Sequence, residues 1–471
     1  MLGNVWKYHK FSVLLILITF LFYWSFAYTL ERVDFIKMIS LWTGLFFVSY
    51  KLIQLNPNNW KFLAVMALLF RIVFLIAIPN LSQDFYRFIW DGRMILEGFN
   101  PYLSLPEVWV AEGNAPIAQA QELYQGMGEL NGHHYTNYPP VSQLCYFIAA
   151  LVASKSILGS AMVFRILIIL ADVGIFYFGR KLLQSLKIPE NRIFWYILNP
   201  FVIIEFSGNL HFEAVMVFFL IWSLYLLQKG YWYWAAVVLA LSVSVKLIPL
   251  LFLPLFFRKF VFREPENCNV FSWIGTLPKL IGFYSIVLGV VLLTFAPFLS
   301  EQFLYNYKRT ISLWFQNFEF NASIYFIVRW IGYKVVGWNV IETAGKILPL
   351  VTVTIILGLT FFRKNRTIPQ LITGMLLGIC TYYFLSTTIH PWYIAVPLSL
   401  CIFTRYKFPI AWSFVIIFSY TAYIDPNFKE NLWMVGLEYL VVFAVFGWEI
   451  YCNGYDKELP FAKESYQRIN D

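Results

Sequence analysis

Apolar runs about as long as a membrane is thick recur along the whole chain. The first run, residues 11–30, has the ~20 residues that a helix needs to cross the hydrocarbon core of a bilayer. No small-residue cleavage site follows it, which favours a retained helix over a signal peptide. Only 13% of the residues are charged, against roughly 25% in soluble domains. The sequence therefore predicts an all-α polytopic membrane protein.

We expect a bundle of about 13 or 14 membrane-spanning helices. The count depends on residues 248–257, which are too short to cross alone and are expected to form a broken pair with their neighbour around Pro249. The expected spans are residues 11–30, 35–55, 61–79, 161–183, 192–207, 212–228, 231–246, 248–257, 280–298, 345–362, 369–387, 391–404, 408–424 and 431–450.

Basic residues gather in short loops that fall on the same side as the N-terminus. The positive-inside rule makes this side cytoplasmic, so the net charge of +9 indicates orientation rather than nucleic-acid binding. The assignment requires that residues 138–159 do not cross the membrane, and their paired prolines, Gln143 and Lys155 favour the outer interface. The basic clusters are residues 180–192, 258–263, 363–366 and 405–407.

This topology divides the chain into five segments, and it places two long loops on the non-cytoplasmic face. The segments are N-terminal transmembrane helices (1–79), an outer loop with juxtamembrane helices and the candidate catalytic motif (80–160), a transmembrane core module (161–298), a second outer loop (299–344), and C-terminal transmembrane helices with a cytoplasmic tail (345–471).

The first outer loop carries an unusual density of charge. Asp84, Arg87 and Asp91 follow helical spacing and share one face of an expected juxtamembrane helix. Asp84 comes directly after a spanning segment, so burial is expected to raise its pKa toward the range of a general base. Asp91 is interpreted as the ion-pair partner of Arg87 or Arg93. The alternative interpretation is an Asp–Arg anchor that holds the helix at the headgroup layer.

Polar residues also interrupt apolar segments further along the same face. His211 and Glu213 stand at the start of a spanning helix, whose dipole favours anions, although a helix cap is the alternative. Lys246 breaks a long apolar stretch and is expected either to bind a phosphate or to snorkel. Arg329 suits a bidentate phosphate contact, with ordinary loop packing as the alternative. His390 is held at a membrane boundary by the turn at Pro391.

Metal binding has little support in the sequence. His133 and His134 lie near Glu129, but adjacent histidines in a polar loop are more often solvated than metal-bound. The five cysteines are scattered and contain no CxxC motif.

The order of these motifs resembles that of a known enzyme superfamily. Residues 84–102 read DFYRFIWDGRMILEGFNPY, followed by YPP (138–140), HFEA (211–214), KLIP (246–249), FNASIY (320–325) and HPWY (390–393). In this order they resemble the membrane glycosyltransferases of the GT-C superfamily, in particular bacterial mannosyltransferases that depend on polyprenyl-phosphate mannose. The resemblance covers about residues 60 to 400.

The resemblance implies an active site on the outer face of a bacterial inner membrane. It implies a polyprenyl-phosphate sugar as donor, a lipid or glycan as acceptor, and membrane lipids around the protein. Gln83 stands where many members have a second acid. The catalytic base is therefore assigned to Asp84 alone, and no cofactor is expected, a divalent metal being disfavoured.

The residues support the same chemistry directly. Sugar transfer from a lipid phosphate needs a carboxylate to accept the proton of the acceptor hydroxyl and cations to stabilise the departing phosphate. One acting base predicts a single displacement with inversion. We expect Asp84 and His390 at the reaction centre. The expected substrate-binding residues are Arg87, Asp91, His211, Glu213, Lys246, Asn321, Arg329 and Tyr393.

A transporter or flippase of lipid-linked sugars is the alternative function. Such proteins tend to show internal repeats with polar breaks in matching halves, and no repeat is visible in this sequence. An acyl or phosphate-group transferase is disfavoured because the sequence offers no Ser–His or metal constellation. The residues leave open whether the sugar is mannose or another hexose.

Overall fold

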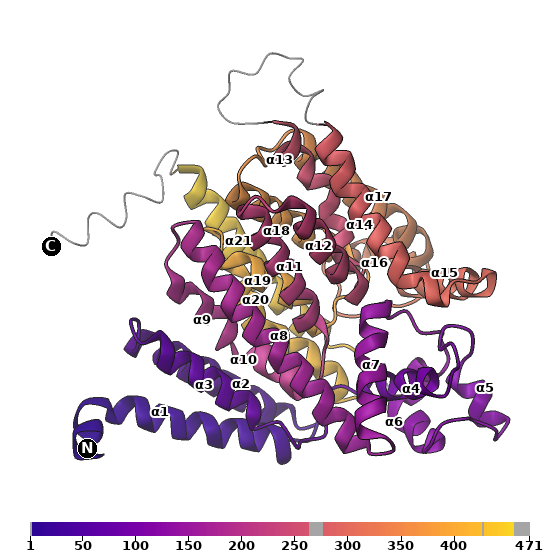
Figure 1. The fold of residues 1–471 in the computed structure, drawn as a ribbon, viewed down its shortest axis with the longest axis horizontal. Helices are drawn as coiled ribbons and strands as arrows, with labels where there is room; N and C mark the ends of the chain where they lie inside the picture. Colours follow the sequence, from indigo (N-terminus) through magenta and orange to yellow (C-terminus); the bar gives the residue numbers. More distant parts are fainter. Residues whose placement is uncertain (1, 263–276, 426–427, 456–471) are drawn as a thin grey trace.

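The computed structural model describes residues 2–262, 277–425 and 428–455, and helices make up most of them (Figure 1). No strand occurs within these ranges, where extended pairing is limited to an isolated bridge between Phe320 and Thr388. The predicted all-α class is confirmed.

The first three helices form a layer at the lower left of Figure 1. Asp34 starts the second helix by accepting a hydrogen bond from the backbone N–H of Lys37 at 3.0 Å, so the chain reverses in a short turn that contains Arg32. Asn59 caps the third helix in the same way, through the N–H of Phe62 at 3.3 Å. These helices are α1 (Leu2–Tyr28), α2 (Phe35–Leu55) and α3 (Trp60–Ile72).

Four shorter helices of residues 84–153 lie at the lower right of Figure 1. The first of them, α4, buries Phe85, Phe88 and Ile89 and packs against α6 and α7. Gly92 permits this approach, because a Cβ atom there would lie 2.2 Å from the carbonyl oxygen of Tyr146. The four helices are α4 (Asp84–Leu96), α5 (Pro106–Ala111), α6 (Ala120–Gly132) and α7 (Pro140–Ala153).

The centre of the bundle is built from one long helix and several broken ones. Helix α8 has 29 residues, whereas the following segments are interrupted by prolines and by 3-10 or π turns. These elements are α8 (Ile157–Ser185), η1 (Glu190–Ile193), α9 (Phe194–Ile197), α10 (Pro200–Val202), η2 (Ile203–Gly208), α11 (Glu213–Gln228), α12 (Trp232–Val245), η3 (Ile248–Phe256), α13 (Phe257–Val261), α14 (Leu277–Phe295) and η4 (Ala296–Phe298).

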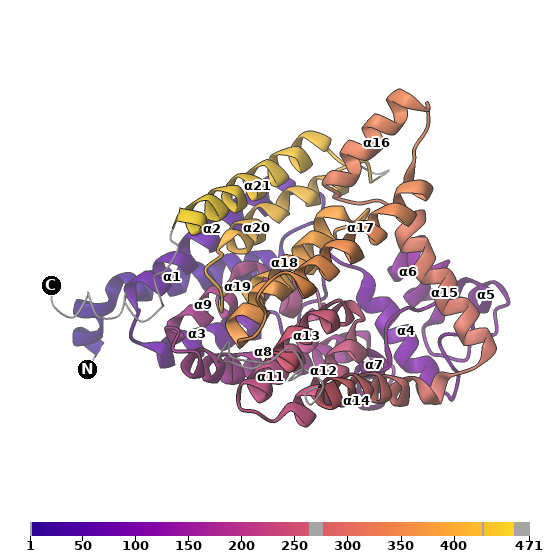
Figure 2. The same cartoon turned by 90° about the horizontal axis from the view of Figure 1, so that it is seen from above.

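The C-terminal helices complete the bundle and return to the N-terminal layer. Figure 2 shows α20 and α21 across the bundle from α7 and α14. The indole N–H of Trp42 in α2 donates to the carbonyl of Phe414 in α20 at 2.9 Å. The elements are α15 (Glu301–Gln316), α16 (Ile324–Val335), α17 (Ile341–Phe361), α18 (Ile368–Leu385), η5 (Pro391–Ile394), α19 (Ala395–Cys401), α20 (Phe408–Val415), η6 (Ile416–Tyr423) and α21 (Leu432–Tyr455).

Fewer helices than predicted are long enough to cross a membrane alone. By length and composition, seven described helices qualify, or eight when the bent pair Pro200–Gly208 and Glu213–Gln228 counts as one span. The second of them, Phe35–Leu55, has the predicted bounds. The predicted spans at 61–79, 231–246 and 391–424 instead contain helices shorter than 18 residues. Apolar composition alone does not distinguish a spanning helix from a short helix enclosed by its neighbours.

Candidate active site

Six of the ten predicted site residues line one cavity of about 930 Å³. This volume falls within the roughly 300–1,000 Å³ that is usual for small-molecule sites. Its walls come from the α1–α2 turn, the start of α4, the loops after α6 and α12, and the segments before α11 and η5. The six residues are Asp84, His211, Glu213, Lys246, His390 and Tyr393.

Asp84 is the first residue of α4 and keeps part of its carboxylate open to the cavity. Its Oδ1 accepts a hydrogen bond from the side-chain amide of Asn131 at 3.2 Å. Burial raises the pKa of Asp84, and this effect outweighs the Asn131 hydrogen bond and the charges of Lys246 and Arg32, which lower it. The predicted direction of the shift is confirmed.

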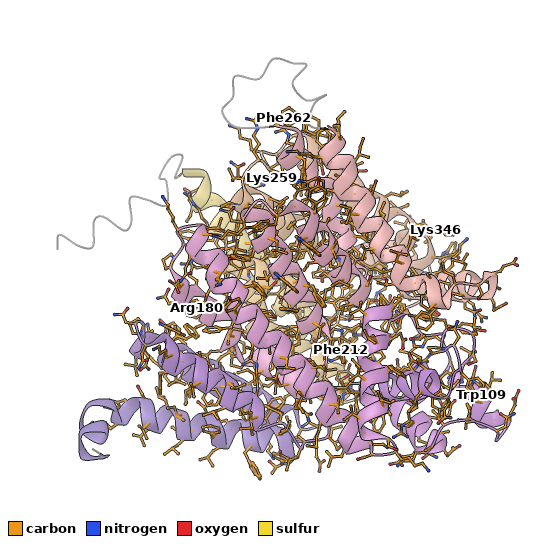
Figure 3. The ribbon with its side chains drawn as sticks, viewed as in Figure 1. Trp109, Arg180, Phe212, Lys259, Phe262 and Lys346 are labelled. Atoms are coloured by element: carbon orange, nitrogen blue, oxygen red, sulfur yellow. The ribbon has the colours of Figure 1, made fainter. Side chains whose placement is uncertain are left out.

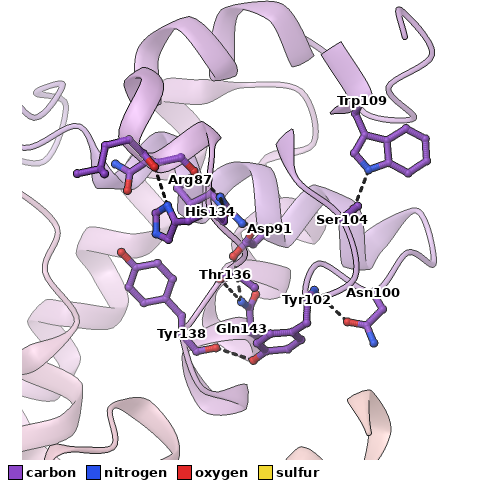
Figure 4. A network of polar contacts seen from close by, with 12 residues as sticks. Arg87, Asp91, Asn100, Tyr102, Ser104, Trp109, His134, Thr136, Tyr138 and Gln143 are labelled. Carbon is purple, nitrogen blue, oxygen red and sulfur yellow. Dashed lines mark hydrogen bonds and ion pairs between the residues drawn. The ribbon is translucent and has the colours of Figure 1, made fainter. Parts of the chain in front are cut away.

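Arg87 and Asp91 lie behind this wall rather than in it (Figure 4). Arg87 Nε is 2.9 Å from Asp91 Oδ1, and Gln143 donates to the other carboxylate oxygen at 3.0 Å. Arg87 also donates to the backbone carbonyls of Asn131 and His134. Through these contacts Arg87 and Asp91 hold the C-terminal end of α6, whose Asn131 contacts Asp84, and the residues that follow it. The predicted Arg87–Asp91 pair is confirmed. Neither residue lines the cavity, and their predicted contact with substrate stays a prediction.

Glu213 and Lys246 form an ion pair in the cavity wall. Glu213 begins α11, and Lys246 stands where α12 ends and the proline-containing η3 follows. The side chain of Lys246 is 19% exposed and its ammonium lies 5.6 Å from the ring centroid of Tyr393. Lys246 therefore has the anionic partner that a buried lysine requires.

His211 and His390 each stack on the ring of Trp392. The ring centroids are 3.7 Å apart for His211 and 4.6 Å apart for His390, with interplanar angles of 19° and 4°. Burial lowers the pKa of His390 to about 3 and that of His211 well below its usual value. Both imidazoles are therefore neutral at physiological pH and act as hydrogen-bonding groups rather than as cations.

The segment before His390 is held by the second outer loop. The N–H of Phe320 donates to the carbonyl of Thr387 at 3.1 Å, and the N–H of Ile389 donates to the carbonyl of Phe320 at 2.8 Å. Asn321 supports this pairing from outside the cavity. Its side-chain amide donates to Glu438 at 3.1 Å, and its carbonyl accepts from Tyr439 at 2.7 Å. Asn321 does not line the cavity, so its contacts hold neighbouring segments together, and its predicted contact with substrate stays a prediction.

Arg329, which the sequence predicts to bind phosphate, lies outside the cavity, and its role in binding stays a prediction. Arg329 forms an ion pair with Glu319, and its Cζ lies 4.2 Å from the ring centroid of Phe326. It does not line the cavity. Its charge is therefore already compensated by a carboxylate ten residues away in the chain.

In the ranges 2–262, 277–425 and 428–455, no group of three or more His, Cys, Asp or Glu side chains is arranged so that it could hold a metal ion. His133 instead pairs with Glu107, with 2.6 Å between Nε2 and the carboxylate. In the hydrogen bond between its neighbour His134 and Leu130, Nδ1–H of the imidazole donates to the Leu130 carbonyl at 2.7 Å. The expectation that no metal is required stays a prediction.

The sequence model of one protein family matches residues 20–261, a range that holds Asp84, His211, Glu213 and Lys246. The family is described as "Alpha-(1->6)-mannopyranosyltransferase, N-terminal domain". The chain belongs to this mannosyltransferase family. The predicted resemblance to bacterial mannosyltransferases is confirmed.

The chain is also similar to a protein from Corynebacterium glutamicum that is named alpha-(1->6)-mannopyranosyltransferase B. It is 24% identical to this chain over 172 residues, which make up 35% of this chain and 27% of that protein. The similarity to this relative therefore covers little more than a quarter of the relative's length.

Arg32, Asn131 and Trp392 line the cavity but were not predicted from the sequence. Asn131 and Trp392 carry no local signal, because their roles depend on Asp84 and on two histidines distant in the chain. Arg32 does carry one. On the predicted topology it is a basic residue on the outer side, the same departure from the positive-inside trend that identified Lys246.

Proposed function

We propose that the protein transfers a hexose, most simply mannose, from a polyprenyl-phosphate donor to a hydroxyl of a lipid or glycan acceptor. Three carboxylates line the cavity, those of Asp84, Glu129 and Glu213, and Glu129 is exposed at its edge. The observation that carries the proposal is the state of the two less exposed, inner carboxylates, Asp84 and Glu213. Glu213 is held by Lys246, whereas Asp84 has no ion-pair partner among the residues that the structure describes. Asp84 is therefore the carboxylate free to accept a proton.

In the proposed reaction the acceptor hydroxyl gives its proton to Asp84, and its oxygen attacks the anomeric carbon. The bond between that carbon and the phosphate oxygen breaks, and polyprenyl phosphate leaves with the bonding electron pair. Because Glu213 is neutralised by Lys246, a second carboxylate nucleophile is not at hand, which favours single displacement with inversion. An α-linked product, as in the family's description, then requires a β-linked donor sugar.

The lining next to the polar end suits the lipid part of such a donor. Directly after Lys246, residues Leu247, Ile248, Leu250 and Leu251 line the same cavity. A phosphate near the Lys246 ammonium would place an attached prenyl chain along these side chains, where its burial is favourable.

Transfer by purified protein in detergent separates this proposal from a transporter. The protein is incubated with labelled polyprenyl-phosphate mannose and extracted cell-envelope lipids. We expect labelled glycoside to form while polyprenyl phosphate is released. A transporter moves the lipid-linked sugar between two compartments and forms no glycoside. The absence of transfer to any acceptor would therefore contradict the enzyme proposal.

We propose that the cavity opens on the outer, non-cytoplasmic side of the membrane, opposite the basic segments. Arg192 donates to the carbonyl of Thr404 at 2.9 Å, and Arg258 donates to that of Arg363 at 3.3 Å, so basic segments distant in the chain meet at two places. Figure 3 shows Arg180 and Lys259 away from the cavity residue Phe212 and from Trp109.

Single-cysteine labelling tests this orientation. In a background without native cysteines, Asn114→Cys and Gln184→Cys place thiols at two exposed positions on opposite sides of the predicted membrane. We expect an impermeant reagent added outside right-side-out vesicles to label position 114 only. Labelling of both positions from outside would mean that α7 belongs to a span, and labelling of position 184 alone would place the site on the cytoplasmic face; either result contradicts the proposed orientation.

The pH dependence of transfer tests the environment of Asp84. Burial raises its pKa, and a base acts only when ionised, so kcat/KM should fall as pH drops through a value above the ~3.9 of an ordinary aspartate. His390, with a pKa of about 3, stays neutral across this limb. An acid limb at or below pH ~4 would show that Asp84 is not desolvated in the working enzyme.

A further inference from the structure

Arg32 is the second inner cation of the cavity, and it comes from the N-terminal layer. It lies in the turn between α1 and α2, and it lines the cavity together with Asp84 and Lys246. Its Cζ lies 3.3 Å from the ring centroid of Tyr423, the last residue of η6. The packing of α2 against α20 and η6 brings this turn to the site.

The two cations differ in how their charges are compensated. Lys246 is paired with Glu213. No carboxylate of the described ranges lies within ion-pair distance of Arg32, and its buried Nε has no hydrogen-bond partner there. Arg32 is partly buried, and a cation withdrawn from water without a counter-charge is costly; the contact with the Tyr423 ring offsets only part of that cost. An anionic ligand would compensate it.

The shape of the group favours a phosphate as that ligand. The guanidinium lies over the Tyr423 ring, and its Nε–H has no hydrogen-bond partner in the described ranges, so this N–H is available to a ligand oxygen. The planar fork of a guanidinium matches two phosphate oxygens. The charges of both Lys246 and Arg32 act on Asp84, so the proposed base and the two cations share one environment. A phosphate bound there would lie within reach of the reacting sugar.

We propose that Arg32 binds the phosphate of the lipid-linked donor, an inference that rests on the proposed function. Arg329 provides a matched control within the same chain. Its guanidinium also lies over an aromatic ring, that of Phe326, but it is paired with Glu319 and lies outside the cavity. The two arginines thus share the aromatic contact but differ in two features: Arg32 lines the cavity and has no carboxylate partner in the described ranges, whereas Arg329 has such a partner and lies outside the cavity.

The test compares binding of polyprenyl phosphate and polyprenol, two lipids that differ only in the phosphate. Purified protein in detergent is titrated with each, and binding is followed by tryptophan fluorescence, since Trp314 and Trp392 line the cavity. The parent should prefer the phosphate lipid. Arg32→Ala should reduce that preference roughly tenfold to a hundredfold, the loss expected for a charge-assisted contact. Arg32→Lys should restore part of it, and Arg329→Ala should keep all of it.

The outcomes separate this inference from the function on which it rests. An unchanged phosphate preference in Arg32→Ala, with transfer activity intact in the parent, overturns the role of Arg32 alone. A lost preference combined with no transfer by the parent on any acceptor counts against the enzyme and supports a phosphate-lipid binding site. Thermal unfolding of each variant shows whether it is folded, and Arg32→Gln serves in the same comparison if the alanine variant is not.

Discussion

Replacement of Asp84 by asparagine is expected to lower kcat roughly 10²- to 10⁴-fold, the usual loss when a positioned general base is removed. Asparagine keeps the size of the side chain and an oxygen that can accept the hydrogen bond from Asn131. It cannot take the proton of the acceptor hydroxyl. Because the base contacts the acceptor rather than the phosphate, the affinity for polyprenyl-phosphate mannose should stay near that of the parent. Single-turnover rates and donor titrations measure the two effects separately.

Asp84→Glu is the matched variant for this experiment. It keeps the carboxylate but moves it by one methylene, so partial activity should remain. Normal turnover in Asp84→Asn would exclude Asp84 as the base. In that case Glu213 is the other inner carboxylate of the cavity, and it would have to act despite its pairing with Lys246.

Much of the fold follows from features that are local in the sequence. Apolar runs of about 20 residues, such as Phe35–Leu55, predict spanning helices because the bilayer sets their length. The short broken element η3 was also predicted, from Pro249 and the short run at 248–257, whereas η6 was not, since its residues are as apolar as those of a span. Their short lengths are possible because neighbouring helices enclose them, which is a tertiary property.

The site residues could be predicted where a polar or charged side chain stands beside an apolar segment, because such a side chain costs free energy of folding unless it has a function. Asp84, Lys246 and His390 stand next to apolar segments, and the fold brings them to one cavity. Which cation is compensated was not predictable. Arg329 and Arg32 carry similar local signals, but only the structure shows Glu319 beside the first and no carboxylate of the described chain beside the second.

Replacement of Asp91 by asparagine is expected to act on stability rather than on chemistry. Asp91 is fully buried, and its loss of charge leaves the Arg87 guanidinium uncompensated in the interior. Breaking one side of a buried pair costs about 3–5 kcal/mol. The amount of folded protein and its thermal unfolding midpoint should therefore fall. Turnover per folded molecule should fall far less than in Asp84→Asn, because Asp91 lies outside the cavity lining.

A double variant distinguishes the charge effect from a loss of packing. Arg87→Met combined with Asp91→Leu removes both charges and fills the space with apolar atoms, which is often neutral or stabilising for a buried pair. Recovery should be partial, because the carbonyls of Asn131 and His134 lose their donor. That loss loosens the C-terminal end of α6, whose Asn131 contacts Asp84. The double variant should therefore unfold at a higher temperature than Asp91→Asn yet turn over more slowly than the parent. If Asp91→Asn unfolds at the same temperature as the parent, the Arg87–Asp91 pair does not stabilise α4 and its neighbours. If the variant folds normally but is inactive, transfer depends on Asp91 rather than on Asp84.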